Sequence, residues 1–183
     1  MTKTALILID IQNDYFPGGM WPVAKMDSVS GNAAKLLARF RAAGDMVVHL
    51  RHEIPSDQAP FFRPGSVGAQ IHASVAAQGD EPVLLKHKPS SFIGTDLLDR
   101  LQAGGITRVV ICGAMSQMCI DATSRAAADL GFEVVVIEDA CGAKEMEFGG
   151  VTLSAEQVHA AFMAPLAMSY GTVTGTTDFL ADA

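Results

Sequence analysis

The stretch TRVVICGAMSQMCIDATSR, residues 107–125, decides the fold because it predicts a buried strand, a sharp turn and a helix in direct succession. Residues 107–112 form a short β-rich apolar run of the kind that a parallel sheet buries on both faces, and Gly113 ends it. The helix follows at once, with Ser116 as its predicted N-cap and Cys119 near its third position. Free backbone N–H groups and the helix dipole favour a thiolate there. The stretch therefore predicts a nucleophilic cysteine, with a small buried hydrophobe as the alternative role of Cys119.

Two other apolar strands end in a charged residue. ALILID ends at Asp10, and VLLK ends at Lys86. The carboxyl ends of parallel strands lie along one edge of a sheet, where the sites of open α/β sheets form. We therefore expect Asp10, Lys86 and Cys119 to converge at that edge. The alternative for Asp10 and Lys86 is an ion pair that only closes the strand ends.

Strand and helix signals alternate along all 183 residues, which predicts one α/β domain over residues 1–183. The predicted strands cover 4–9, 46–50, 82–86, 107–112, 133–137 and 171–175. The predicted helices cover 28–43, 95–103, the segment from 116 onward, and 154–166. Because parallel strands need crossovers that cover both faces of the sheet, we expect a three-layer α/β/α fold.

Composition narrows the class of protein. The formal charge of -7 and a pI near 5.1 argue against a nucleic-acid partner, and the first apolar run is far too short to span a membrane. The three cysteines, at 112, 119 and 141, show no metal-ligand spacing. Their odd number and the absence of a secretory segment predict a cytoplasmic protein.

Four ordered motifs resemble the isochorismatase-like, or cysteine hydrolase, superfamily, which includes nicotinamidases and N-carbamoylsarcosine amidases. Asp10 stands in a D-x-Q-N-D-aromatic motif, Lys86 in K-x4-[SA]-F followed by T-D-L, and Cys119 in G-x-x-[ST]-x-x-C. EVVVIEDACGA at 133–143 is similar to the next strand of the family, so the resemblance covers nearly the whole chain. It implies a six-stranded, mostly parallel sheet in the order 3-2-1-4-5-6, and homo-oligomers such as dimers or tetramers.

The resemblance also implies an activity, the hydrolysis of C–N bonds in a small amide, carbamoyl or ureido compound through a thioester. Lys86 would favour the thiolate, and Asp10 would accept the proton of Cys119. The N–H groups of Met115 and Cys119 would hold the oxyanion, at a non-proline cis peptide between Ala114 and Met115.

A metal site is not expected. Nicotinamidases carry a D-x-H pair after the second strand and a further histidine downstream, whereas this chain has RHEI at 51–54 and two phenylalanines at 61 and 62. The histidines His49, His52, His72 and His87 do not recreate a ligand spacing on one element. We predict no metal and no cofactor.

Candidates for the substrate pocket come from two loops and the catalytic motif. They are Gln12, Tyr15, Phe16, Trp21, Phe61, Phe62 and Met118. Aromatic walls suit a planar or apolar amide, and ordinary core packing is the alternative. Gln12 can instead orient Asp10 or satisfy the turn. Residues 51–81 are more than a connection needs, which indicates a lid, a pocket wall or an interface.

Other functions remain open at this stage. A non-catalytic protein on the same fold is disfavoured by the complete set of Asp10, Lys86 and Cys119. A redox-thiol protein would need Cys112 or Cys141 as the resolving partner, because no C-x-x-C is present. Within the family, isochorismatase and nicotinamidase activities are alternatives. The retained thiol argues against the first, because the resemblance implies that cleavage of a vinyl ether needs none.

Overall fold

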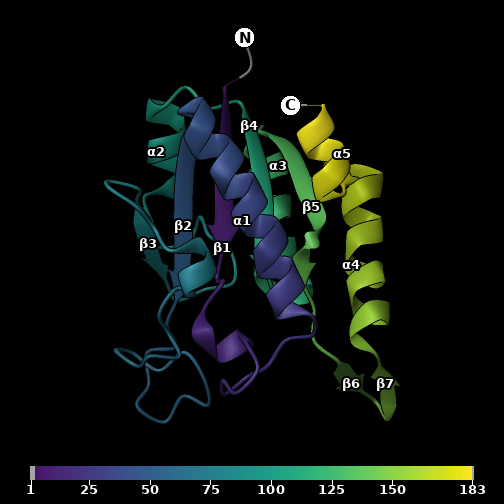
Figure 1. The fold of residues 1–183 in the computed structure, drawn as a ribbon. Helices are drawn as coiled ribbons and strands as arrows, with labels where there is room; N and C mark the ends of the chain where they lie inside the picture. Colours follow the sequence, from purple (N-terminus) through teal and green to yellow (C-terminus); the bar gives the residue numbers. More distant parts are fainter. Residues whose placement is uncertain (1–2, 183) are drawn as a thin grey trace.

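The computed structural model describes residues 3–182, which form a parallel sheet with helices on both faces (Figure 1). Its strands are β1 (Thr4–Ile9), β2 (Met46–His52), β3 (Val83–Lys86), β4 (Arg108–Ala114), β5 (Glu133–Gly142) and β8 (Thr172–Thr174). The sheet has six strands in the order β3-β2-β1-β4-β5-β8, and every neighbouring pair is parallel. This order confirms the predicted 3-2-1-4-5-6 arrangement, with β8 as the sixth strand.

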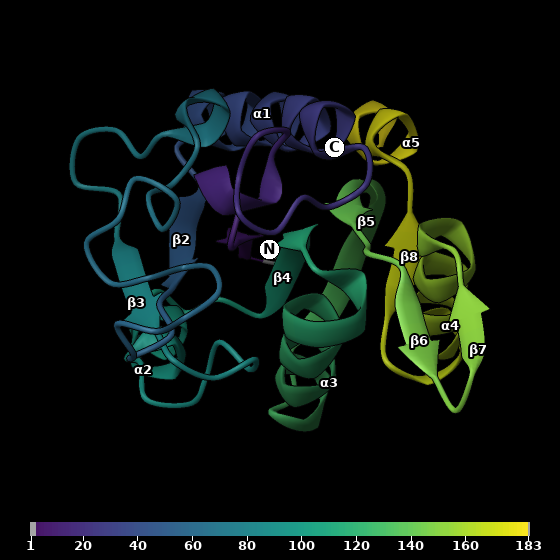
Figure 2. The same ribbon diagram turned by 90° about the horizontal axis from the view of Figure 1, so that it is seen from below.

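The helices divide between the two faces of the sheet. They are α1 (Met26–Ala43), α2 (Leu97–Ala103), α3 (Asp121–Asp129), α4 (Ala155–Ser169) and α5 (Thr176–Ala181). Seen from below, α1 and α5 lie on one side, with α2, α3 and α4 on the other (Figure 2). A hydrophobic core lies on each face of the sheet, and alternate residues of β1 point into one or the other. Leu6 and Leu8 pack under α1, while Ile7 and Ile9 pack on the opposite face. The three-layer prediction is confirmed.

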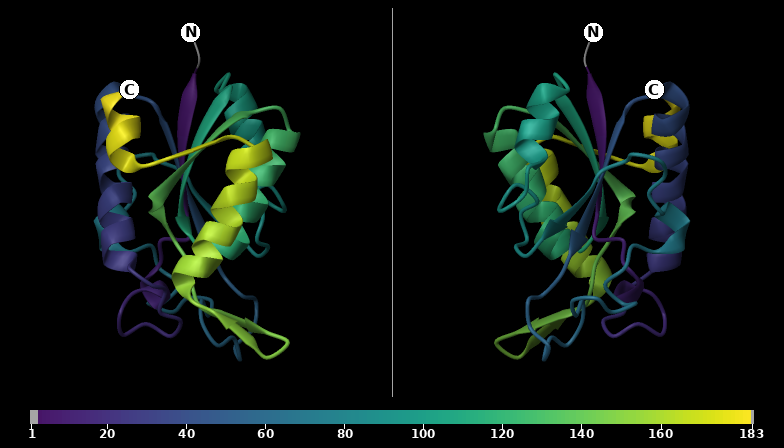
Figure 3. Two further views of the ribbon diagram at one scale, coloured as in Figure 1. Left: turned by 90° about the vertical axis from the view of Figure 1, so that its right-hand side faces the viewer. Right: turned by 90° about the vertical axis from the view of Figure 1, so that its left-hand side faces the viewer.

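The carboxyl ends of the strands meet at one end of the molecule, opposite the two chain termini (Figure 3). The long loops after β1 and β2 gather at this end (Figure 1). At this end β4 approaches β1 closely at Gly113. This residue has a φ of +128°, and a side chain there would clash with the carbonyl oxygen of Ile9, so the position requires glycine. The turn after β4 therefore lies directly beside the end of β1.

A hairpin, the last helix and two 3-10 turns, Asn13–Tyr15 and Ala73–Val75, were not predicted from the sequence. A hairpin of β6 (Met146–Phe148) and β7 (Val151–Leu153) projects beside α4, and α5 follows β8. Every residue of the hairpin is exposed, so it has no buried face to produce a periodic signal. The predicted elements are present with changed bounds. The helix α1 begins at Met26 rather than 28, α2 begins at Leu97 rather than 95, and α4 continues to Ser169. The strands β2 and β5 continue to His52 and Gly142, past the predicted ends at 50 and 137.

Candidate active site

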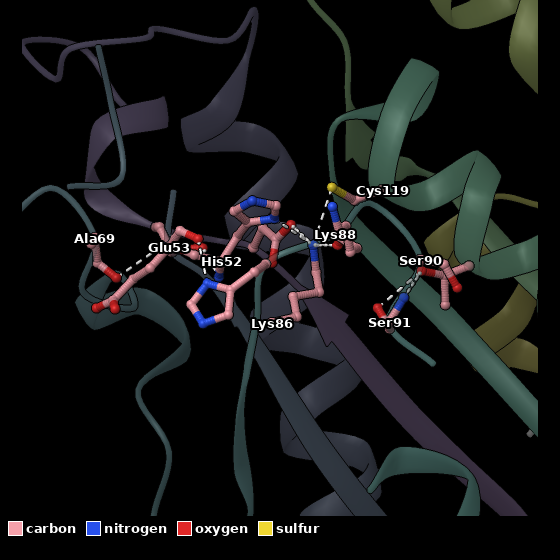
Figure 4. Close-up of polar contacts among 12 residues, drawn as sticks. His52, Glu53, Ala69, Lys86, Lys88, Ser90, Ser91 and Cys119 are labelled. Carbon is pink, nitrogen blue, oxygen red and sulfur yellow. Dashed lines mark hydrogen bonds and ion pairs between the residues drawn. The ribbon is translucent and has the colours of Figure 1, made fainter. Parts of the chain in front are cut away.

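Asp10, Lys86 and Cys119 meet at the carboxyl ends of three strands. Lys86 Nζ lies 2.7 Å from Asp10 Oδ2 and 3.2 Å from Cys119 Sγ, the contact drawn in Figure 4. Asp10 and Lys86 are 0% exposed and Cys119 is 5% exposed. Asp10 follows β1, Lys86 ends β3 and Cys119 lies in the turn after β4, so the predicted convergence is confirmed.

His52 is a fourth member of this cluster. From the sequence it was a candidate only for a metal ligand. It ends β2, which lies between β1 and β3, and its Nδ1 is 2.9 Å from Lys86 Nζ. Burial, followed by the charge of Lys86, lowers the pKa of His52 to about 4. The imidazole is therefore neutral at pH 7 and accepts a hydrogen bond from Lys86. The predicted strand stopped at residue 50, whereas β2 continues to His52, so the strand-end rule did not locate this residue from the sequence.

The electrostatics of the thiol differ from the expectation. Burial raises the pKa of Cys119 and the Asp10 carboxylate raises it further, while the charge of Lys86 opposes them. The predicted net preference for a thiolate is therefore wrong for the free protein, because exclusion of water outweighs the cation. Burial also opposes the charge on Lys86, yet attraction to Asp10 contributes to a raised pKa of its ammonium. The resting site holds a neutral thiol beside a buried ion pair.

Asp10, His52 and Cys119 offer ligand atoms that all lie within 4.8 Å of one another, which is the spacing of a metal site. Lys86 Nζ is within 3.2 Å of one atom from each of the three. The ammonium thus takes the central position that a metal would need. This donor set does not fit a metal while Lys86 is present, so the absence of a metal stays our prediction.

The turn that carries Cys119 differs from the predicted helix start. Residues Ser116–Ile120 form a π-helical turn whose N-cap is Met115, and the peptide between Ala114 and Met115 is cis. Ser116 is not the N-cap, because its Oγ lies 3.2 Å from Gly142 O and 2.9 Å from His159 Nδ1. These partners come from β5 and α4, so tertiary contacts override the local capping preference.

The aromatic pocket candidates form a layered wall. Trp21 and Phe61 are partly buried and stacked, with ring centroids 4.7 Å apart. Tyr15 and Phe62 are buried and pack against Phe61, whereas Phe16 is buried and stacks on His72. Burial, Cys119 and Asp10 all raise the pKa of Tyr15, so its phenol stays neutral beside the site. Met118 is 43% exposed at the surface of the turn.

Gln12 joins the two loops that surround the site. Its Nε2 donates to His52 O and Ala69 O, each at 2.8 Å, and its Oε1 accepts from His52 N at 2.8 Å. Both amide protons are thus already used, which favours the alternative that Gln12 positions the strand ends rather than binding substrate. Asp14 makes a second hydrogen bond between the same two loops, because its carboxylate accepts from the Phe62 N–H at 2.7 Å. The first loop is therefore hydrogen-bonded to the segment of residues 52–69.

Comparison with known proteins agrees with this fold. The isochorismatase domain model matches residues 4–178. The uncharacterized isochorismatase family protein YddQ of Bacillus subtilis is 46% identical over 177 residues, covering 97% of this chain and 98% of YddQ. A solved structure described as an isochorismatase hydrolase from Oleispira antarctica has a TM-score of 0.93 at 50% identity, covering 98% of this chain and 97% of that one.

A streptothricin hydrolase of Streptomyces noursei is 37% identical over 138 residues, which are 74% of this chain and 48% of that protein. Within residues 3–182, no helix is long and apolar enough to cross a membrane. On the family model, the relatives and the fold together, this chain belongs to the isochorismatase family.

Proposed function

We propose that this protein hydrolyses a C–N bond of an amide, carbamoyl or ureido group in a small molecule, through a thioester on Cys119. The observation that carries the proposal is the position of Lys86 Nζ, between Asp10 Oδ2 at 2.7 Å and Cys119 Sγ at 3.2 Å. A nucleophile, a base and a cation share one buried cluster, which is the arrangement that covalent catalysis by a thiol requires. Similarity to a streptothricin hydrolase supports the reaction class.

The first step forms the thioester. Asp10 accepts the proton of Cys119, and the sulfur attacks the carbonyl carbon of the substrate. Asp10 Oδ1 is buried and has no hydrogen-bond partner among residues 3–182, so it is free to accept that proton. Lys86 holds the growing negative charge on sulfur. The backbone N–H groups of Met115 and Cys119 belong to the same turn and stabilise the oxyanion.

The second step releases the amine and the acid. The tetrahedral intermediate collapses, the C–N bond breaks, and Asp10 returns its proton to the leaving nitrogen. Asp10 then removes a proton from a water molecule, whose oxygen attacks the thioester carbon. The C–S bond breaks, and Asp10 gives that proton to the sulfur, which restores the thiol. The products are a carboxylic or carbamic acid and an amine, with no change in oxidation state.

The experiment is turnover of a panel of small amides, carbamoyl compounds and ureides, with intact mass after acid quench. We expect an adduct of the acyl mass on Cys119 and loss of turnover in Cys119→Ala. Cys112→Ala is the matched control. Cys112 is also buried, but it packs in the hydrophobic core on the opposite face of the sheet from Cys119. Turnover by Cys119→Ala at the wild-type rate would refute the proposal.

The homo-oligomer implied by the family resemblance is a separate proposal. Analytical ultracentrifugation of the purified protein tests it, with a dimer or tetramer as the expected species.

A further inference from the structure

Lys86 and Cys119 belong to strands that are not neighbours in the sheet. Lys86 ends β3 and Cys119 follows β4, and both β2 and β1 lie between these strands. Three strand spacings separate β3 from β4 in the sheet, which is about 14 Å. Lys86 Nζ is nevertheless 3.2 Å from Cys119 Sγ. This contact therefore depends on the long side chain of Lys86 and on how the segments that follow the two strands pack together.

A buried pair of hydroxyl groups joins these two segments. Ser91 lies in the loop after β3, and Thr123 lies in α3, one helical turn after Cys119. The Ser91 N–H donates to Thr123 Oγ1 at 3.0 Å, and Thr123 Oγ1 donates to Ser91 Oγ at 2.9 Å. Both residues are 0% exposed. Within residues 3–182, the other side-chain hydrogen bond between these segments is that of Lys86 with Cys119.

The loop that contains Ser91 is fixed at both ends. Lys86 Nζ donates to Lys88 O at 3.2 Å near its start (Figure 4). Ser91 O accepts from Thr95 Oγ1 at 2.5 Å, and Thr95 Oγ1 accepts from the N–H of Leu97 at 3.3 Å, at the first residue of α2. The loop is therefore bonded to Lys86, to α2 and, through Ser91, to α3.

Loss of the Thr123 hydroxyl would leave two polar groups of Ser91 buried without their partner. These are the backbone N–H, which donates to Thr123 Oγ1, and the hydroxyl oxygen, which accepts from it. A buried donor or acceptor without a partner is costly, so the loop would shift until water or another group satisfied them. Such a shift separates the loop of Lys86 from the helix that follows Cys119.

We propose that Thr123 is a positioning residue whose hydroxyl, through Ser91, holds the loop of Lys86 against the turn of Cys119 and keeps the ammonium in contact with the sulfur. Thr123 acts through these residues rather than on the substrate. Its effect on the thiol needs no substrate, whereas its effect on turnover rests on the proposed function.

The test is Thr123→Val, which keeps the branched shape and deletes the hydroxyl. The measurement is the rate of alkylation at Cys119 against pH, with the other two cysteines replaced by alanine. Asp10 raises the pKa of this thiol and Lys86 lowers it. Because the variant moves the ammonium away from the sulfur, we expect the pKa of Cys119 to rise by about half a unit or more. An unchanged profile would overturn the inference.

Three further variants serve as controls. Thr123→Ser keeps the hydroxyl and should restore the wild-type profile. Ser124→Ala is the matched control, because Ser124 is also 0% exposed and adjacent in α3, but its Oγ has no hydrogen-bond partner among residues 3–182. It should leave the profile unchanged. Ser91→Ala should give a smaller shift than Thr123→Val, because its N–H still donates to Thr123, and it carries the test should Thr123→Val not fold.

The Lys86→Met background distinguishes positioning from a general loosening of the site. Thr123→Val should cause no further shift in the pKa of Cys119 there, because the charge that it displaces is absent. Equal shifts with and without Lys86 would overturn the inference, since they would show that Thr123 acts on the thiol by another route.

Turnover separates this inference from the proposed function. With a substrate found in the panel, Thr123→Val should lower kcat about tenfold with little change in KM. A wild-type kcat in this variant would overturn the inference and leave the proposed function intact. The expected shifts in the alkylation profiles, with no turnover of any panel compound by the wild type, would refute the proposed function alone.

Discussion

The ammonium of Lys86 and the carboxylate of Asp10 lie 2.7 Å apart, with both side chains fully excluded from water. Removing one member of such a pair leaves a buried charge without its partner, which costs on the order of 3–5 kcal/mol of stability. The two charges act on Cys119 in opposite directions, since Asp10 raises the pKa of the thiol and Lys86 lowers it. Burial raises the pKa of the Cys119 thiol most, and the two members of the ion pair modify that pKa in opposite directions.

Lys86→Met tests the role of the cation without any substrate. The variant keeps most of the side-chain stem and deletes the charge, so the pKa of Cys119 should rise by roughly one unit or more. The measurement is the rate of alkylation at Cys119 against pH, in a background where Cys112 and Cys141 are replaced by alanine.

Asp10→Asn in the same background is the opposite-sign control. It removes the carboxylate that raises the pKa of Cys119, so its alkylation profile should move to lower pH. Circular dichroism first establishes that both variants are folded. An unchanged profile in Lys86→Met would mean that Lys86 does not tune the thiol.

Chelators should not affect activity, because the Lys86 ammonium takes the position that a metal would need between Asp10, His52 and Cys119. The measurement is turnover before and after dialysis against a chelator. Activity that is lost on chelation and restored by zinc, iron or manganese would contradict the prediction.

Lys86→Ala supplies the positive control for the metal prediction. Without the ammonium, the three ligand atoms within 4.8 Å of one another are free to bind a divalent cation. We expect this variant, and not the wild type, to bind Co²⁺ with a sulfur-to-cobalt charge-transfer band. Equal cobalt spectra for the two proteins would show that Lys86 does not exclude the metal.

His52 predicts a pH dependence of stability. Its pKa is about 4 in the folded protein, compared with 6.5 as its usual value, so the unfolded chain binds the proton first as the pH falls. Stability should therefore be complete above pH 6.5 and decline from there towards pH 4. The urea midpoint of unfolding measures it, and His52→Asn should show a shallower decline. Some slope should remain, because burial also lowers the pKa of His49.

His159 should support the turn of Met115 and Cys119, whose N–H groups we propose as the oxyanion donors. Its Nδ1 lies 2.9 Å from Ser116 Oγ, and its Nε2 lies 3.5 Å from Glu138 Oε2. His159→Ala frees Ser116, so we expect kcat to fall about tenfold to a hundredfold with little change in KM, because small displacements of catalytic groups are costly. His159→Asn places a polar atom near the former Nδ1 and should restore part of kcat. Equal kcat values for wild type and His159→Ala would contradict the prediction.

The strand ends show what could be predicted from sequence. An apolar run followed by Asp10, and another ending at Lys86, are local signals, and parallel strands place their carboxyl ends on one edge. His52 obeys the same rule, since β2 lies between β1 and β3. Its contact with Lys86 required the strand order, which no local pattern contains.

The sequence by itself determined the alternation of strands and helices, the edge of the sheet that carries the candidate site, and Asp10, Lys86 and Cys119 at that edge. Each follows from a short run of neighbouring residues. Only the tertiary structure decided the raised pKa of the Cys119 thiol and the partners of Ser116. These properties depend on which distant groups approach and how much water they exclude. Burial and hydrogen bonding across the fold are not encoded in the spacing of any one segment.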